Sequence, residues 1–337
     1  MLDRIARISQ DHPLRVILGS LAAAAAALVI GLLLISGLSA SGFNDPGSNA
    51  VLAQDAVVDA TGASAVPSMV AIVNPGAPIA SPEGQATVAQ VVRTMDRDPG
   101  VARVAAPVPG TDALVSAGGD KASVLAFFGD IDDDESQRTA ARLEDRLERI
   151  PGVTVGGGWT AAAETSSIVG EDLLRAELIA FPLLFLVSLW VFRGLVASLL
   201  PPLMGALVIF GGFFFLGVGN EVFGLSVYAL NLVTGLGLGL AIDYSLLMVS
   251  RYREEIARTG PGYQALAVTM RTAGKSVIFS AITVGAALAA LMIFPQDFLF
   301  SMGFGGLVVA LVAAVVAVGV LPAVLALLGH RVNALAP

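Results

Sequence analysis

The sequence has 337 residues, of which 55% are hydrophobic and 14% charged, with a formal net charge of −8. Soluble domains carry about 25% charged residues, so this composition predicts a membrane protein, and the lack of a basic cluster argues against nucleic-acid binding. The chain contains no cysteine, which excludes disulfides and thiol catalysis, and only two histidines, His12 and His330. We therefore expect no metal, no cofactor and no enzymatic site.

The first apolar run, 16–38, follows three basic residues, Arg4, Arg7 and Arg15. A helix needs about 20 apolar residues to cross a bilayer, and this run has that length. A secretory signal peptide is the alternative, because Leu38-Ser-Ala-Ser resembles a small-residue cleavage site. The run is longer than a typical signal-peptide core and further spans follow. We therefore expect 1–38 to be a cytoplasmic N-terminus and the first transmembrane helix.

Residues 39–172 are polar, acidic and rich in glycine and proline. Strands are expected at 67–73, 101–106, 122–128 and from residue 153, and helices at 81–97 and 132–150. Ser81 is a suitable N-cap for the first of these helices, with Glu83 in its first turn. The order β-α-β-β-α-β matches the split ferredoxin-like motif. We predict an α+β ferredoxin-like domain between the first and second transmembrane helices.

Two features of this domain each allow two interpretations. An acidic cluster could be a calcium loop, but it lacks the alternating oxygen ligands of an EF-hand, and carboxylates also suit a helix start. Its members are Asp130, Asp132, Asp133, Asp134 and Glu135. Trp159 could stack on a substrate or could pack the base of the domain. We favour the helix start and the packing role.

Five more apolar segments follow, at 173–192, 195–218, 225–249, 276–294 and 299–328. A charged connector, 250–275, breaks at Gly260-Pro-Gly262, which predicts a helix extension followed by a short interfacial helix. Lys and Arg gather at 250–275 and near both termini, whereas the short loops on the other side have none. We expect transmembrane helices 2–6 within 173–330 and a cytoplasmic tail at 331–337, so that both termini are cytoplasmic.

Asp243 places a carboxylic acid inside the apolar run 225–249. It lies eight residues before Arg251, which on a helix is about 12 Å from the charged end. Ionisable groups at such depth are costly and mark ion or proton pathways. Tyr244 can donate a hydrogen bond to a carboxylate and accept one from water, which suits a proton relay. The alternative is a neutral, structurally bonded acid.

Small and polar residues accompany this acid. Gly235, Gly237 and Gly239 alternate and so cover more than one helix face, where they would allow close or sliding helix contacts. Asn231, Ser280 and Thr283 could extend a water wire, although lone Ser and Thr side chains often bond to their own helix. Glycines at 235, 237 and 239 follow no strand, so they form no dinucleotide loop.

Gly274-Lys275-Ser276 imitates the end of a phosphate-binding loop. Thr269 stands where that motif needs its first glycine, so the motif fails. Because no other nucleotide motif is present, ion coupling is favoured over nucleotide hydrolysis.

At this point the sequence resembles a known family. One helix, a large ferredoxin-like domain and five further helices form the half-unit of the resistance–nodulation–division (RND) transporters. Residues 235–255 closely resemble the fourth helix of the MMPL branch of that superfamily. Residues 294–303 are similar to that branch's turn between helices five and six, and 321–329 to its sixth-helix ending. The resemblance covers nearly the whole chain.

The resemblance implies an inner-membrane exporter of lipids, glycolipids, siderophores or hydrophobic drugs, driven by proton entry. The family's Asp–Tyr proton relay maps onto Asp243 and Tyr244, and the domain at 39–172 corresponds to its porter domain. Family members carry a second six-helix repeat with its own pair. We therefore expect a homodimer, pairing with another half-chain, or a truncated product. The alternatives are a SecD/SecF-like translocation auxiliary, and a non-transporting scaffold or lipid sensor.

Overall fold

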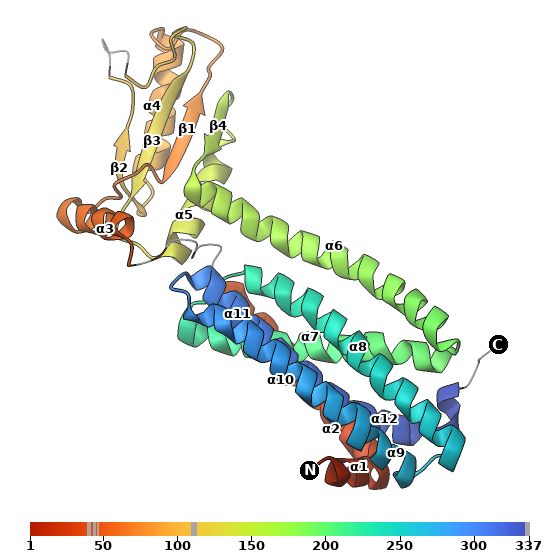
Figure 1. Ribbon diagram of the computed structural model, residues 1–337. Helices are drawn as coiled ribbons and strands as arrows, with labels where there is room; N and C mark the ends of the chain where they lie inside the picture. The colour runs from red at the N-terminus through yellow and green to blue at the C-terminus, as the bar shows by residue number, and fades with distance from the viewer. Residues whose placement is uncertain (39–41, 43–44, 46, 109–112, 334–337) are drawn as a thin grey trace. The chain divides into compact units, whose positions relative to one another are not determined.

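The computed structural model describes residues 1–38, 42, 45, 47–108 and 113–333. The small residues 39–41, which carry the possible cleavage site, and residues 334–337 of the tail lie outside this description. The chain divides into two compact units. One comprises Met1–Leu38 and Glu171–Pro337 and is helical, and the other is Ser39–Gly170 and contains a sheet (Figure 1).

The helical unit contains long apolar helices together with three shorter ones, α1, α9 and α12. They are α1 (Leu2–Asp11), α2 (Pro13–Leu34), the C-terminal part of α6 (Gly158–Phe192), α7 (Leu195–Phe223), α8 (Tyr228–Thr259), α9 (Tyr263–Thr269), α10 (Lys275–Ala289), α11 (Asp297–Val315) and α12 (Leu321–Leu328). Among the described residues, five continuous helical stretches are long and apolar enough to cross a membrane. A shorter apolar stretch, Leu178–Phe192, lies in α6. The chain is a multi-pass helical membrane protein.

Helix α8 lies at the centre of the packing in this unit. It packs against α7 and α11, while α2 packs against α7 and α10 packs against α11. Figure 1 shows α7, α8, α10 and α11 running alongside one another. Glycines permit the closest approaches, because a Cβ on Gly31 of α2 would lie 2.8 Å from the backbone nitrogen of Phe214 on α7.

The connector after α8 differs in part from the prediction. Helix α8 ends at Thr259, and Gly260 and Gly262 adopt positive φ angles of 76° and 146° at the break. Helix α9 then continues through a single π-helical turn, Met270–Gly274, directly into α10. The predicted helix extension and the break at Gly260-Pro-Gly262 are confirmed. The expectation of a separate short helix is wrong, because Tyr263–Ile293 is one continuous helical stretch.

Helix α1 was not expected from the sequence. It packs against α9 and α12. The Asp3 carboxylate accepts a hydrogen bond of 2.6 Å from Nε of Arg271, and the Arg7 guanidinium lies 5.6 Å from the ring centroid of Tyr263. These contacts fasten the N-terminal segment to the start of the span Tyr263–Ile293.

In its described residues, the second unit contains four strands, three complete helices and the start of α6. The elements are α3 (Asn49–Thr61), β1 (Met69–Val73), α4 (Pro82–Asp96), β2 (Val101–Ala105), β3 (Ala122–Phe128), α5 (Asp133–Leu147) and β4 (Val153–Gly156). The strands are arranged in the order β2-β3-β1-β4, and every neighbouring pair is antiparallel. From β1 to β4 the elements follow the predicted order β-α-β-β-α-β. Helix α3 was not predicted.

The core of this unit lies between the sheet and the helices α4 and α5. Alternate residues of β1, Met69, Ala71 and Val73, are fully buried, as are Val91 of α4 and Leu143 of α5. This alternation is expected of a sheet covered on one face.

Both helix starts in this core are capped by side chains. The Ser81 hydroxyl accepts a hydrogen bond of 3.1 Å from the Gly84 amide at the start of α4. The Asp132 carboxylate accepts one of 2.7 Å from the Glu135 amide at the start of α5. A carboxylate at this position satisfies a free amide and complements the helix dipole. The helix-start interpretation of the acidic cluster is therefore confirmed at Asp132.

Candidate functional site

The two residues of the expected relay point in different directions from α8. Consecutive residues on a helix are separated by about 100°. Tyr244 is turned into the helical unit and is 4% exposed, whereas Asp243 is exposed. Among the described residues the Asp243 carboxylate accepts no hydrogen bond. The sequence places this acid within an apolar span, but the described part of the chain does not bury it.

Tyr244 contacts the span Tyr263–Ile293. Its hydroxyl lies 3.4 Å from the hydroxyl of Ser280 on α10, near the upper limit for a hydrogen bond. Ser280 is half-buried. One of the three polar groups considered for a water wire is therefore brought to the relay tyrosine.

The other two polar groups do not reach Tyr244. The hydroxyl of Thr283 donates a hydrogen bond of 2.9 Å to the carbonyl oxygen of Phe279 on its own helix. This is the local bond that lone Thr residues commonly form. Asn231 is exposed and lies twelve residues before Asp243 on α8.

Asp243 belongs to a face of α8 that the rest of the described chain leaves uncovered. Residues spaced by four follow one inclined ridge along a helix. Asn231, Gly235, Gly239 and Asp243 have this spacing and all are exposed. We call these four residues the open face of α8. A side with two polar groups and two glycines differs from the large aliphatic surface that lipid normally meets.

The three glycines divide between two sides of α8. A Cβ on Gly237 would lie 2.8 Å from a methyl of Val309 on α11 and 3.3 Å from a methyl of Val208 on α7, so Gly237 supports close packing. Positions 235 and 239 have no described heavy atom within 4 Å of the corresponding Cβ. The expected close contact is present at Gly237 and absent at Gly235 and Gly239.

A shallow groove adjoins the open face. Gly235 and Gly239 line it together with Ala176, Ala180 and Leu184 of α6, and its volume is about 280 Å³. Its lining is almost entirely apolar. Small residues on both helices leave this space, because no side chain longer than a methyl projects from four of the five positions named.

The cytoplasmic end of α8, as the sequence predicts it, is held by charged contacts. Arg251 lies 2.7 Å from Glu254 and 2.6 Å from Glu255, whose side chain is 4% exposed. Nη1 of Arg253 donates a hydrogen bond of 2.8 Å to the carbonyl oxygen of Phe192, the last residue of α6. These contacts fix the helix that carries Asp243 and Tyr244 and join it to α6.

Several known proteins are similar to this chain in sequence. The chain is 36% identical over 261 residues to the membrane protein SCO6666 of Streptomyces coelicolor, covering 76% of this chain and 37% of that protein. It is 38% identical over 206 residues to the trehalose monomycolate exporter MmpL3 of Mycolicibacterium smegmatis. This alignment covers 60% of this chain and 20% of that exporter. It is 30% identical over 189 residues to the mycolic acid-containing lipids exporter MmpL11 of the same organism. This alignment covers 55% of this chain and 19% of that exporter.

The aligned regions thus span well under half the length of these relatives. A family model gives the broader assignment: the model of the MMPL family matches residues 42–337, which include the second unit and the helices α6–α12. The resemblance seen in the sequence is confirmed, and this chain belongs to the MMPL family.

Proposed function

We propose that this chain is a proton-driven exporter subunit that moves a lipidic or otherwise amphipathic substrate out of the plasma membrane. It has six transmembrane helices, with Leu178–Phe192 as part of the second, and cytoplasmic termini. The second unit is a ferredoxin-like porter domain outside the membrane. Family membership and the two relatives named as lipid exporters support this proposal.

The observation that carries the proposal is the position of Asp243 on the open face. A carboxylic acid at membrane depth is costly and persists where it serves ion or proton movement. Tyr244 follows it directly and reaches Ser280 on α10, so a proton bound at Asp243 has polar groups beside it that lead toward a second helix. Protonation would remove a charge from the open face and change what that face can pack against.

The position of Asp243 on the open face also supports a second chain that packs against this face. An ionisable group, an amide and two glycines facing lipid would be unfavourable, and small residues suit close helix packing. We propose that the open face is covered by a second copy of this chain or by another six-helix half. The relay would then lie between the two halves.

The relay is tested by Asp243→Asn, with Glu221→Gln as a control that removes an exposed carboxylate elsewhere. Purified protein is placed in vesicles with a pH gradient and a fluorescent glycolipid. Asp243→Asn should abolish proton-coupled lipid movement while protein yield and melting temperature stay unchanged, and the control should behave as wild type. Undiminished transport by Asp243→Asn would refute the relay.

The partner is tested by cross-linking, because the chain contains no cysteine of its own. Gly239→Cys places one thiol on the open face, and Phe279→Cys places one on a 74% exposed position of α10. With a short thiol cross-linker in membranes, Gly239→Cys should form a dimer, whereas Phe279→Cys should not. Equal reaction of both variants, or none, would count against the open face as the interface. A product of another mass would identify a different half-chain.

A further inference from the structure

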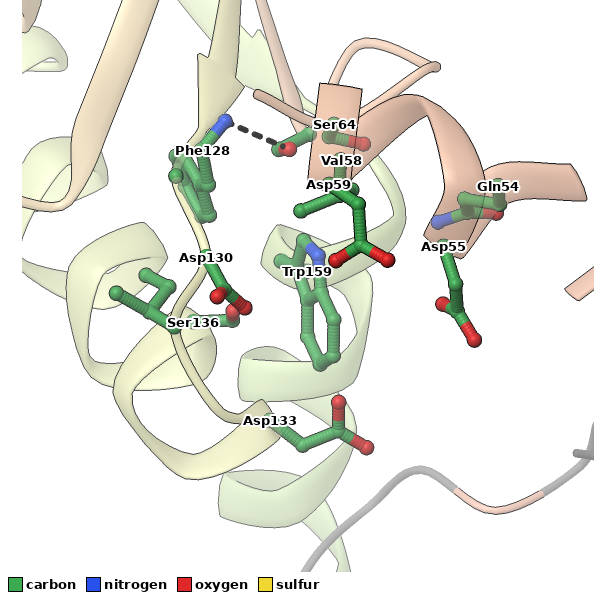
Figure 2. Close-up of a pocket in the computed structure, with 13 residues that line it drawn as sticks. Gln54, Asp55, Val58, Asp59, Ser64, Phe128, Asp130, Asp133, Ser136 and Trp159 are labelled. Carbon is green, nitrogen blue, oxygen red and sulfur yellow. Dashed lines mark hydrogen bonds between the residues drawn. The ribbon is translucent and has the colours of Figure 1, made fainter. Parts of the chain in front are cut away.

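The second unit contains a cavity that is separate from the open face of α8. Its volume is about 450 Å³. It is lined by α3, by the end of β3 and the start of α5, and by the start of α6. Figure 2 shows the indole of Trp159 standing between Asp130 and Ser136 on one side and Asp59 and Asp55 on the other. These groups come from segments far apart in sequence, so only the folded unit assembles them.

The charged side chains that line the cavity are all negative. Four aspartates, Asp55, Asp59, Asp130 and Asp133, line the cavity, and no lysine or arginine is among its lining residues. Such a concentration of one sign in a partly enclosed space raises the local concentration of oppositely charged ligands. Anionic groups such as phosphates are disfavoured, and cations are favoured.

The spacing of the acids argues for a ligand larger than a metal ion. Among the described residues no three His, Cys, Asp or Glu side chains approach closely enough to hold one metal ion. A cavity of about 450 Å³ also exceeds the space that a single ion needs. A polyatomic cation can contact several separated carboxylates at once.

Uncharged side chains also line the cavity, among them Ser136, Ser68 and Trp159. The Ser136 side chain is only 3% exposed. The Ser68 hydroxyl accepts a hydrogen bond of 3.0 Å from the Phe128 amide. Trp159 packs partly against the core, which is the role favoured from the sequence, and it also lines the cavity.

We propose that this cavity binds an organic cation through a quaternary ammonium group. Trp offers the most favourable aromatic face for such a group, and nearby carboxylates balance its charge. Trp159 would contact the methyl groups of the ligand, Asp59 and Asp130 would supply the opposite charge, and Ser136 would bond to a polar substituent. This binding site goes beyond the proposed transport function and does not depend on it.

Choline is the probe, and the full-length protein in detergent is titrated with it. The chain has two tryptophans, Trp159 and Trp190. Trp190 is 81% exposed, so Trp190→Phe is a tolerated background in which Trp159 is the only tryptophan. Choline should change the fluorescence of Trp159 in a saturable way. Sodium chloride at equal ionic strength, magnesium chloride and glucose should not.

Variants then test the residues. Asp59→Asn and Asp130→Asn, made in the same background, should each raise the dissociation constant for choline at least tenfold. Asp145→Asn, an exposed acid of α5 that does not line the cavity, should leave it unchanged. Calorimetry with Trp159→Leu should show binding lost, while circular dichroism shows the fold retained.

Three outcomes would overturn the proposal. They are a non-saturating response to choline, an equal response to sodium or magnesium, and a saturable response to glucose with none to choline. Unchanged binding by both aspartate variants would overturn it as well. Asp243→Asn should bind choline as wild type does, so failure of transport and failure of this site can be told apart.

Discussion

The hydroxyl of Tyr244 on α8 lies 3.4 Å from the hydroxyl of Ser280 on α10, and both helices pack against α11. The two residues come from different transmembrane spans. A proton reaching Tyr244 therefore has an acceptor on a neighbouring helix. Asp243 is turned by about 100° from Tyr244 on the same helix turn, so the pair directs one polar group toward α10 and the other onto the open face.

Tyr244→Phe keeps the ring that fills the helix interior and removes only the hydroxyl. We expect proton-coupled transport in vesicles to fall by about 10²-fold, since positioned proton-transfer groups contribute effects of that size. The melting temperature should change little, because a long hydrogen bond contributes at most about 1 kcal/mol. Ser280→Ala should reduce transport less, because water can replace its hydroxyl. Wild-type transport by Tyr244→Phe would remove the tyrosine from the pathway.

Gly237 and Gly239 form a matched pair for a packing test. An added methyl at Gly237 would meet Val309 at 2.8 Å, whereas one at Gly239 meets open space within the described chain. Gly237→Ala should lower stability by about 1–3 kcal/mol through overpacking. Gly239→Ala should keep or raise the stability of the single chain, since Ala favours the helix by up to about 1 kcal/mol. Thermal unfolding in detergent measures both, and an equal loss in the two variants would contradict the assigned sides.

Asp98 is the buried acid of the second unit. Its side chain is 1% exposed and lies 3.3 Å from Arg142 and 3.4 Å from Arg146, and it accepts a hydrogen bond of 3.1 Å from the Gly100 amide. Asp98→Ala should destabilise this unit by about 2 kcal/mol, the scale of hydrogen bonds to a charged group.

Hydrogen–deuterium exchange along α5 reports this loss directly. Asp145→Ala removes the exposed partner of Arg149 on the same helix and serves as the control, because exposed ion pairs contribute little. Faster exchange in Asp98→Ala than in the control is expected. If the two variants exchange alike, the buried pair does not hold α5.

Glu144 gives the second unit a pH dependence. Burial raises the pKa of its carboxyl, and repulsion from Glu164 and Glu148 raises that pKa further. The folded state therefore binds this proton more tightly than the unfolded chain. Its contribution to stability is favourable below the ordinary value of 4.5 and is lost as pH rises through the folded pKa.

Glu144→Gln should accordingly raise the melting temperature at pH 7.5, and this gain should vanish as pH falls toward 4. Asp120 gives the opposite sign, because a hydrogen bond from Ser116 lowers the pKa of its carboxyl. Asp120→Asn should lower the melting temperature at neutral pH and lose this effect in acid. If the change in melting temperature follows pH in the same way for both variants, these groups do not titrate as described.

Much of the second unit could be predicted from local sequence. The strand expected at 122–128 is β3 with the same bounds, because its apolar run is flanked by turn residues on both sides. Helix α3 was missed although its signals are present: Ser48 caps its start and Gly62, with a φ of 70°, ends it. Its apolar residues do not form a clear stripe, so periodicity alone did not reveal it.

The direction of each side chain on α8 was harder to predict. The alternating glycines indicated more than one helix face, but not which face meets other helices. That depends on where α7 and α11 lie, and no local pattern of α8 encodes their positions. The depth of Asp243 followed from counting residues to Arg251, whereas its exposure on the open face required the folded unit. The choline cavity likewise needs α3, α5 and Trp159 brought together.

The π-helical turn at Met270–Gly274 has a consequence for the meeting of Tyr244 and Ser280. A π turn holds one residue more than an α-helical turn, so every later side chain is rotated by about 100° relative to an uninterrupted helix. A helical wheel drawn straight from Tyr263 to Ile293 therefore assigns Ser280 to a false direction. Deleting one residue from this turn would therefore restore regular winding and leave the serine hydroxyl directed toward α8, whereas regular winding with every residue kept would turn it away.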